Sequence, residues 1–133
     1  MAFTRWDPLR DLLAIQQRLD RFAPGPAGWV PPVDLLETPD GYIITAELPG
    51  VRREDLDIQL HDGRLILSGV RREPGMPFEQ YHRVERGHGS FSRTFHLHAP
   101  VDSKRIVADL RDGVLTVTCP KTTDAGTRRI QVS

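Results

Sequence analysis

The sequence predicts an all-β fold, an antiparallel β-sandwich with an N-terminal arm and a C-terminal tail. From Val33 onward, apolar residues alternate with polar ones, which is the period of strands that bury one face. Asp-Gly pairs at 62–63 and 112–113 separate such segments, as they do in tight β-hairpins. Helical periodicity occurs near the N-terminus alone, so the alternating strands and helices of an α/β fold are missing.

The composition fits one domain with short arms. The chain has 133 residues, of which 27% are charged and 38% hydrophobic, an ordinary balance for a globular protein. Lys and Arg together number 18, as do Asp and Glu, so we expect neither a nucleic acid nor a membrane as partner. The single cysteine, Cys119, allows no internal disulfide. No segment resembles a signal peptide or a membrane span, and we expect a cytoplasmic protein.

Residues 1–32 form the expected N-terminal arm. A helix is predicted over about 8–22, where Asp7 can cap the helix and Pro8 suits its first position. Apolar residues recur there at helical spacing, namely Leu9, Leu12, Leu13, Leu19 and Phe22. Residues 23–32 are rich in proline and glycine and indicate a linker. The alternative is that arm and linker simply pack on the domain.

Residues 33–121 contain six or seven short segments of strand period, as expected of a sandwich. In each segment one alternate set is apolar and is predicted to face the core. The predicted core faces are Tyr42, Ile44, Ala46 and Leu48; Leu56, Ile58 and Leu60; Phe91, Phe95 and Leu97; Ile106, Ala108 and Leu110; and Leu115, Val117 and Cys119.

The stretch 71–89 is long for a loop in so small a domain, and such loops are usually functional or disordered. Within it, the sequence FEQYHRV, residues 78–84, is compatible with a strand but has no neighbouring hairpin partner. A lone strand leaves its backbone donors and acceptors unsatisfied. Pairing with the edge of another copy satisfies them and produces a swapped dimer. The alternative is a flexible surface loop.

Residues 122–133 form the expected tail, a polar stretch that nevertheless carries Ile130 and Val132. Alternate residues of an extended segment point the same way, so these two side chains share one face. The pair is either a docking segment or a frayed terminus with two incidental aliphatic residues.

Arg93 is the unusual residue of the predicted core faces, because it shares a face with Phe91, Phe95 and Leu97. A charge in that position must be paired or lie at an opening. We predict a carboxylate partner, across a dimer. The alternative is that the strand twists enough at its end for Arg93 to reach water.

An enzyme is the main competing class. His96 and His98 share one strand face and can start a metal site, but the spacing marks no third ligand, which a catalytic metal requires. The serines and Cys119 lie in no nucleophile-elbow or Cys-His context. No G-x-x-x-x-G-K motif marks a nucleotide site. We therefore expect no catalytic residues, no metal and no cofactor.

Several motifs, taken in order, resemble those of the small heat-shock proteins, the α-crystallin family, in its bacterial form. They are WDPLRDL, VDLLETPDGYIITAELPGVRREDLDIQL, GSFSRTFHL, ADLRDGVLTVTCPK and the terminal IQV. The most specific parts are Leu48-Pro49-Gly50-Val51 before Glu54-Asp55-Leu56, and Gly113-Val114-Leu115 with Pro120 downstream. The resemblance covers about residues 33–121 and both ends. In one departure, Leu97-His98-Ala99-Pro100 replaces the family's usual Leu-Pro, which lengthens a loop.

The resemblance implies an ATP-independent holdase chaperone, built from dimers of an immunoglobulin-like sandwich that assemble into larger homo-oligomers. Its partners are then other copies of itself and non-native client proteins. In bacterial and plant members the strand in the long loop pairs with the first strand of the partner domain, which here joins Glu79–Val84 to Val33–Glu37. The tail motif, Ile130-x-Val132, docks by strand addition in a groove between two edge strands of a neighbour.

Four sets of residues carry these expectations. The dimer strand exchange involves Phe78, Glu79, Gln80, Tyr81, His82, Arg83 and Val84, with Val33 and Leu35. The tail-accepting groove is lined by Leu56, Ile58, Leu60, Ile106, Ala108 and Leu110. The client-binding arm presents Phe3, Trp6, Leu9, Leu12, Leu13, Phe22 and Trp29. Arg93 is the arginine that matters for assembly.

A plain β-sandwich adaptor is the second alternative. The related CS-domain co-chaperones bind one dedicated partner and need neither the strand at 78–84 nor an apolar pair in the tail. Size separates the two classes, because an adaptor is a monomer or dimer and a holdase is a larger multimer.

Overall fold

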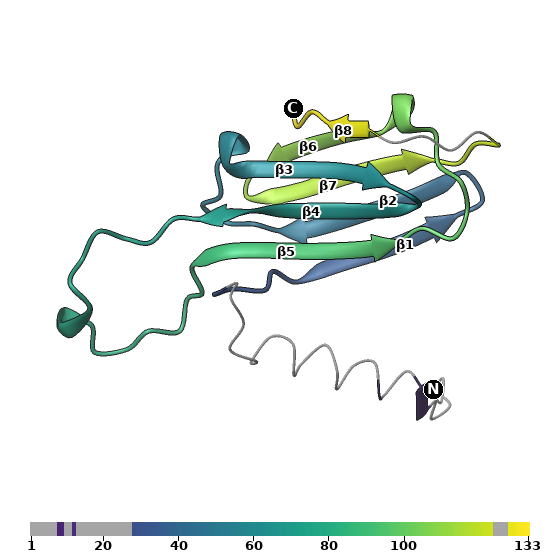
Figure 1. The fold of residues 1–133 in the computed structure, drawn as a ribbon. Coiled ribbons are helices and arrows are strands. Elements are labelled where there is room, and N and C mark those ends of the chain that lie inside the picture. The colour runs from purple at the N-terminus through teal and green to yellow at the C-terminus, as the bar shows by residue number, and fades with distance from the viewer. Residues whose placement is uncertain (1–7, 10–11, 13–27, 124–127) are drawn as a thin grey trace.

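The period-two segments become strands in the computed structural model, which describes residues 8–9, 12, 28–123 and 128–133 (Figure 1). Within these residues the strands are β1 (Val33–Thr38), β2 (Gly41–Glu47), β3 (Leu56–His61), β4 (Arg64–Arg71), β5 (Gly89–His96), β6 (Val107–Arg111), β7 (Val114–Pro120) and β8 (Arg128–Ile130). Short 3₁₀ turns occupy Arg53–Asp55, Phe78–Gln80 and Ser103–Arg105. The predicted all-β fold is confirmed. Most of the predicted helix over 8–22 lies outside the described residues and stays a prediction.

Two four-stranded antiparallel sheets face each other and form the predicted sandwich. One sheet has the strand order β1-β2-β7-β6, and the other has the order β5-β4-β3-β8. Figure 1 shows the layers stacked, with β5 beside β1 at one edge and β8 beside β6 at the other. The last strand of the chain therefore lies at a sandwich edge.

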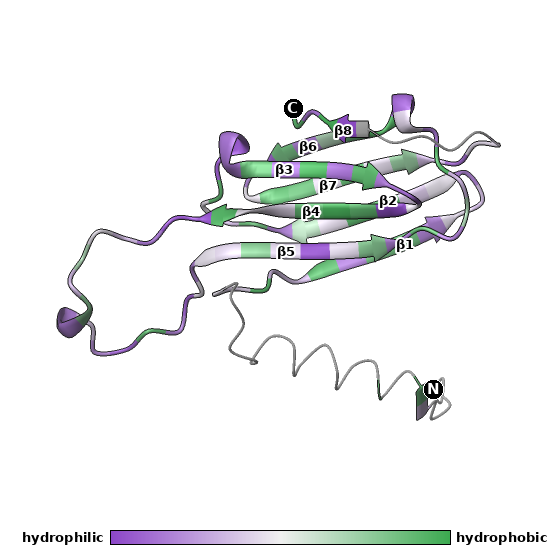
Figure 2. Ribbon diagram, viewed as in Figure 1, coloured by the Kyte–Doolittle hydropathy of each residue, from purple (hydrophilic) through white to green (hydrophobic). Residues whose placement is uncertain are grey.

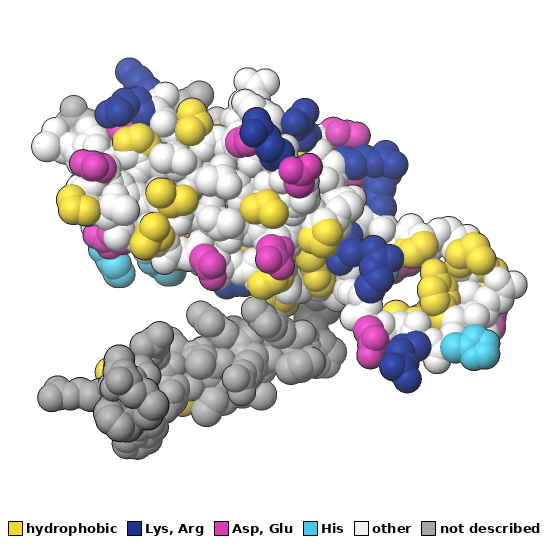
Figure 3. All heavy atoms as spheres, turned by 180° about the vertical axis from the view of Figure 1, so that it is seen from behind, with side chains coloured by type: hydrophobic (Ala, Val, Ile, Leu, Met, Phe, Trp, Pro, Cys, Tyr) yellow, Lys and Arg dark blue, Asp and Glu magenta, His cyan; other side chains and the backbone are white. Residues whose placement is uncertain are grey.

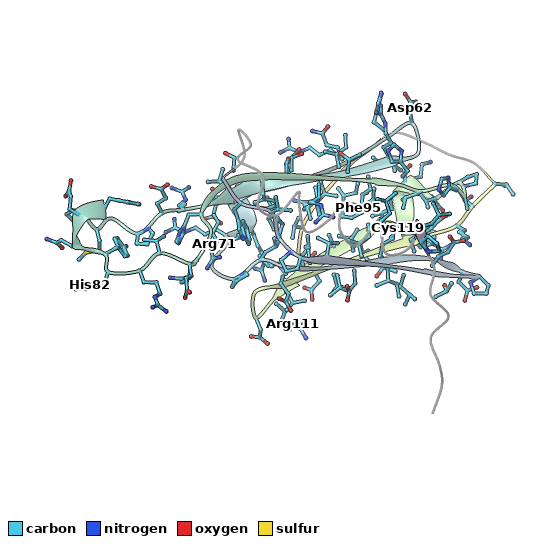
Figure 4. The ribbon with its side chains drawn as sticks, turned by 90° about the horizontal axis from the view of Figure 1, so that it is seen from below. Asp62, Arg71, His82, Phe95, Arg111 and Cys119 are labelled. Atoms are coloured by element: carbon cyan, nitrogen blue, oxygen red, sulfur yellow. The ribbon has the colours of Figure 1, made fainter. Side chains whose placement is uncertain are left out.

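The predicted apolar faces form one core between the sheets. Every residue predicted to face the core is buried, from Tyr42 on β2 to Cys119 on β7. Apolar and polar residues alternate along the strands in Figure 2, and Figure 4 shows Phe95 and Cys119 between the sheets. Burial raises the pKa of the Cys119 thiol to about 12, so it is a neutral core residue at physiological pH rather than a nucleophile.

The two Asp-Gly pairs form the predicted hairpin turns. Asp62 and Gly63 join β3 to β4 with φ values of 50° and 71°, and Asp112 and Gly113 join β6 to β7 with 53° and 77°. Two successive positive φ angles match the right-handed twist of the flanking strands, and Asp followed by Gly accepts them at low cost. These turns fix the register of β3 and β6, the strands that line the candidate site.

Residues before Val33, which we assigned to the arm and its linker, pack against the sandwich. The Trp29 ring packs edge-to-face on Phe91, with ring centroids 5.3 Å apart, and the Arg71 guanidinium lies 5.1 Å from the Trp29 ring. Pro31 is fully buried, and the Pro32 carbonyl accepts a hydrogen bond from Glu47 N at 3.1 Å. Proline has no N–H to satisfy, so a proline-rich segment can pack on a domain as well as link two parts.

Candidate functional site

Strand β6 is the last strand of one sheet, and β3 is the last strand of the other sheet apart from the short tail strand β8. In the described chain, β4 pairs with β3 from inside its sheet and β7 pairs with β6 from inside the other. The predicted groove residues are all buried along this edge, namely Leu56, Ile58, Leu60, Ile106, Ala108 and Leu110. An extended segment placed between the two strands can bond to both backbone edges and cover this apolar floor.

The chain's own tail fills this groove (Figure 1). Strand β8 runs antiparallel to β3 with Ile130 opposite Ile58, and Ile130 is only 4% exposed. Val132 then forms a parallel bridge with Ala108. Ser133 N donates to Ala108 O at 2.8 Å, and Leu110 N donates to Ser133 O at 3.0 Å. The tail thus bonds to one sheet through β3 and to the other through β6.

The structure brings Ile130, Val132 and the six groove residues together within one subunit, whereas we expected the groove of a neighbour. In a single chain the short linker holds the tail close to its own groove, and this high local concentration favours the intramolecular contact. Docking between subunits therefore stays a prediction.

The sequence did not predict a polar contact that lies beside Ile130 and Val132. Arg129 lies opposite Gln59 on β3, and its Nε atom forms an ion pair with Asp57 Oδ1 at 3.0 Å. Gln59 Nε2 donates to the other oxygen, Asp57 Oδ2, at 2.8 Å. The alternation of the tail sequence indicates only that Arg129 faces away from the groove. The register of β8 on β3 was needed to identify Asp57 as its partner.

The long loop, residues 72–88, projects away from the sandwich (Figures 1 and 3). The strand expected at 78–84 is absent from this single chain, and a 3₁₀ turn occupies Phe78–Gln80. An isolated strand has no partner for its backbone groups, which explains the irregular conformation. Apolar side chains are nevertheless exposed here, namely Met76, Phe78, Tyr81 and Val84, with Phe78 at 78%. His82 lies near the loop tip in Figure 4.

Strand β1, the expected acceptor of that loop, lies at the edge of its sheet, and β2 is its one partner among the described strands. Val33 packs against the core, whereas Leu35 and Leu36 are exposed. The structure does not bring the loop to β1 within the chain, so the strand exchange between copies stays a prediction.

Arg93 lies on β5 close to the segment that leads into β1. Its side chain is half-buried, Nη1 donates to the Pro31 carbonyl at 2.9 Å, and the guanidinium lies 5.5 Å from the Phe95 ring. Phe91 and Phe95, two residues before and after it on β5, are buried, so Arg93 shares their strand face. A carboxylate partner across a dimer stays a prediction.

The expected client-binding arm falls mostly outside the described residues. Leu9 and Leu12 are described and exposed, and the expectations for Phe3, Trp6, Leu13 and Phe22 lie outside the described part of the chain. Trp29 is partly buried and packs against the core, and its role in client binding stays a prediction.

The described residues contain no cluster of three or more His, Cys, Asp or Glu side chains that could hold a metal ion. His96 and His98 are both exposed. No helix in the described segments is long and apolar enough to cross a membrane.

Comparisons with known proteins point in one direction. The profile of the Hsp20/alpha crystallin family matches residues 34–133. The chain is 43% identical over 110 residues to the spore protein SP21 of Stigmatella aurantiaca, a match that covers 82% of this chain and 65%, less than two thirds, of that protein. It is 34% identical over 119 residues to the 17.8 kDa class I heat shock protein of Daucus carota, covering 87% of this chain and 76% of that one.

Solved structures agree with the sequence matches. The fold is similar to hspA from Xanthomonas axonopodis, with a TM-score of 0.68 and 36% identity over 74% of this chain and 100% of that one. It is also similar to a small heat-shock protein from Xylella fastidiosa, reported to have a distinct high order structure, with a TM-score of 0.66 and 38% identity over 80% of this chain and 99% of that one.

Proposed function

The chain belongs to the Hsp20/alpha crystallin family, a family of small heat-shock chaperones, and from this membership we propose that it is an ATP-independent holdase. Such a protein binds unfolding clients and prevents their aggregation without consuming nucleotide. Its partners are other copies of the same chain and non-native proteins. The cytoplasm is the proposed compartment, where a free buried thiol such as Cys119 is stable.

The observation that carries the proposal is the edge groove with its two-residue apolar plug. Ile130 and Val132 bind through side-chain burial and backbone pairing, and neither requires the tail and the groove to belong to one subunit. A neighbour's tail can make the same contacts, as in domain-swapped assemblies. Dimers linked in this way form a larger homo-oligomer.

The size of the contact explains why such an assembly is reversible. Fully burying two aliphatic side chains contributes roughly 3–6 kcal/mol at best, and ordering the three residues from Ile130 to Val132 costs about 1–2 kcal/mol for each backbone residue. One plug is therefore only marginally stable. Many plugs in one particle act together through their high effective concentration, so the particle persists while single contacts open and close.

Opening exposes the apolar surface that a holdase needs. The groove floor becomes accessible, and exposed apolar patches bind partly unfolded proteins. The arm supplies aromatic and aliphatic anchors for clients that share no sequence. The loop residues 78–84 form the dimer by pairing with β1 of the partner, which covers its open edge and the exposed Leu35.

One observation favours a second candidate, a monomeric or dimeric adaptor. The tail closes the groove of its own chain, and a subunit that keeps this closure has no need of a neighbour. Such a protein is expected to bind one dedicated partner and to remain small.

Light scattering from a heat-labile client, without nucleotide, tests the proposal. We expect the full chain to suppress aggregation. A variant that lacks residues 1–27 is expected to form smaller oligomers and to protect large clients poorly, because it loses the arm but keeps Trp29 and the sandwich. Full protection by this variant would refute the client-binding role of the arm. An adaptor is expected to leave aggregation unchanged in every form.

A further inference from the structure

One ion pair joins the docked tail to the groove in the described part of the chain. It links Arg129 on β8 to Asp57 on β3 at 3.0 Å. Arg129 directly faces Gln59, so Asp57 is its diagonal neighbour across the strands, a distance that a long side chain spans. Both groups lie on the outer face of the sheet, on the opposite side of β8 from Ile130.

The two members of the pair differ in how firmly they are held. The Asp57 side chain is 32% exposed and accepts a hydrogen bond from Gln59, whereas the Arg129 side chain is 78% exposed. The residues that β4 places opposite Asp57 and Gln59 are Ser68 and Ile66, which are uncharged. The groove therefore presents a positioned carboxylate, and the tail brings a flexible cation to it.

Two residues near the end of the groove, Arg53 and Glu54, carry opposite charges. A cavity of about 640 Å³ opens beside the docked tail, lined by Arg53, Glu54, Leu56 and Arg129–Val132. Arg53 donates to the Leu110 carbonyl at 3.3 Å, so it ties the 3₁₀ turn to β6. Arg53 and Glu54 carry opposite charges, so together they add no net charge at this end.

We propose that Asp57 and Arg129 form a charge lock that selects which tails enter the groove. The apolar fit of Ile130 and Val132 is generic, because any extended pair of aliphatic residues of similar size can bury there. The ion pair adds selectivity. The groove accepts a tail with a cationic residue directly before the isoleucine and rejects a tail with an acidic residue there. The preferred occupant is the tail of a second copy of this chain. This inference rests on the proposed exchange of tails between copies.

A single ion pair contributes little affinity, but the many pairs of an oligomer contribute together. Loss of one exposed ion pair changes an affinity by a factor of about 1.5 to 5. Charge reversal removes the attraction and adds repulsion, which we expect to weaken each contact about tenfold. Because an oligomer uses many such contacts, the assembly magnifies the difference. Salt screens the pair, so the selectivity is expected to fall as ionic strength rises.

Mixing full-length charge variants tests the lock. Arg129→Glu and Asp57→Arg are each expected to raise the subunit concentration needed for assembly by tenfold or more. An equimolar mixture of the two is expected to assemble near the wild-type concentration, because each tail then meets an opposite charge on the other variant. The double variant Asp57→Arg/Arg129→Glu is expected to assemble with itself but to exchange poorly with wild type. Native mass spectrometry and energy transfer between labelled subunits measure assembly and exchange.

Arg111→Glu is the matched control. Arg111 is 80% exposed and pairs with Asp109 at 3.9 Å on β6, in the other sheet from the Arg129–Asp57 pair, and its reversal is expected to leave assembly unchanged. Circular dichroism before mixing checks that each variant is folded, and recovery in the mixture or the double variant excludes a simple folding defect. If Ile130→Ser/Val132→Ser abolishes assembly while both single reversals assemble as wild type does, the lock is wrong and the proposed function stands. If wild type itself never assembles, the lock and the proposed tail exchange both fail.

Discussion

Truncation of Ile130 to alanine tests how much the burial of this side chain holds the tail in the groove. The side chain is 4% exposed and lies opposite Ile58. The substitution deletes three buried carbon atoms, at about 0.8 kcal/mol each, and so removes about 2.4 kcal/mol of burial. Each 1.4 kcal/mol is a factor of ten in an equilibrium constant. The ratio of docked to undocked tail is therefore expected to fall about 50-fold.

Amide hydrogen exchange at Leu110 reports this change directly. Leu110 N donates to Ser133 O at 3.0 Å, so its protection depends on the docked tail. We expect its exchange to accelerate in Ile130→Ala toward the rate of an unprotected amide, by about 50-fold at most, because a single docked tail is only marginally stable. Leu97 N, which donates to Gly63 O at 2.8 Å in the turn between β3 and β4, serves as the internal reference and is expected to keep its rate.

Gln131→Ala is the matched control, because Gln131 lies between the two apolar residues and is exposed. It is expected to leave the exchange of Leu110 close to the wild-type rate. Unchanged exchange of Leu110 in Ile130→Ala, or equal acceleration in Gln131→Ala, would refute the reasoning that side-chain burial holds the tail in the groove.

Three further predictions concern residues outside the tail. Trp29→Ala is expected to lower the free energy of unfolding of the subunit by about 2–4 kcal/mol in urea, because Trp29 packs on Phe91 and Arg71. An unchanged free energy of unfolding would show that this packing does not stabilise the sandwich. Arg93→Ala is expected to reduce oligomer mass in sedimentation more than it lowers the melting temperature of the subunit, and an unchanged sedimentation profile would contradict its role in assembly. Cys119 is expected to resist iodoacetamide at pH 9 in the folded protein and to react in urea, because its folded pKa is about 12 against 9.0. The unfolded thiol ionises first, so this group stabilises the fold fully below pH 9 and loses its contribution as the pH rises toward 12.

Alternation of apolar and polar residues was sufficient to predict the sandwich. A strand that buries one face must place Tyr42, Ile44 and Ala46 on the same side, and no choice of partner strand alters that requirement. The Asp-Gly turns were equally predictable, because the dipeptide itself favours the two left-handed conformations. Local rules therefore gave the elements of the fold and their inner faces.

Contacts between distant segments were not predictable in the same way. Trp29 lies in a proline-rich stretch that resembles a linker. Only its contacts with Phe91 and Arg71 show that it packs against the core. The Arg129–Asp57 pair depends on the register of β8 on β3, which no local pattern specifies. The loop at 78–84 has strand-compatible residues but no strand, because its conformation depends on a partner edge that a single chain does not supply.

Sedimentation of the full chain over a range of concentrations and temperatures, beside Ile130→Ser/Val132→Ser, tests whether copies assemble through their tails. We expect the wild-type chain to sediment as a large multimer that releases subunits on dilution and warming, and the double variant to remain a dimer. A wild-type chain that sediments as a single subunit under all these conditions, with its tail closed on its own groove, would contradict assembly through the tails.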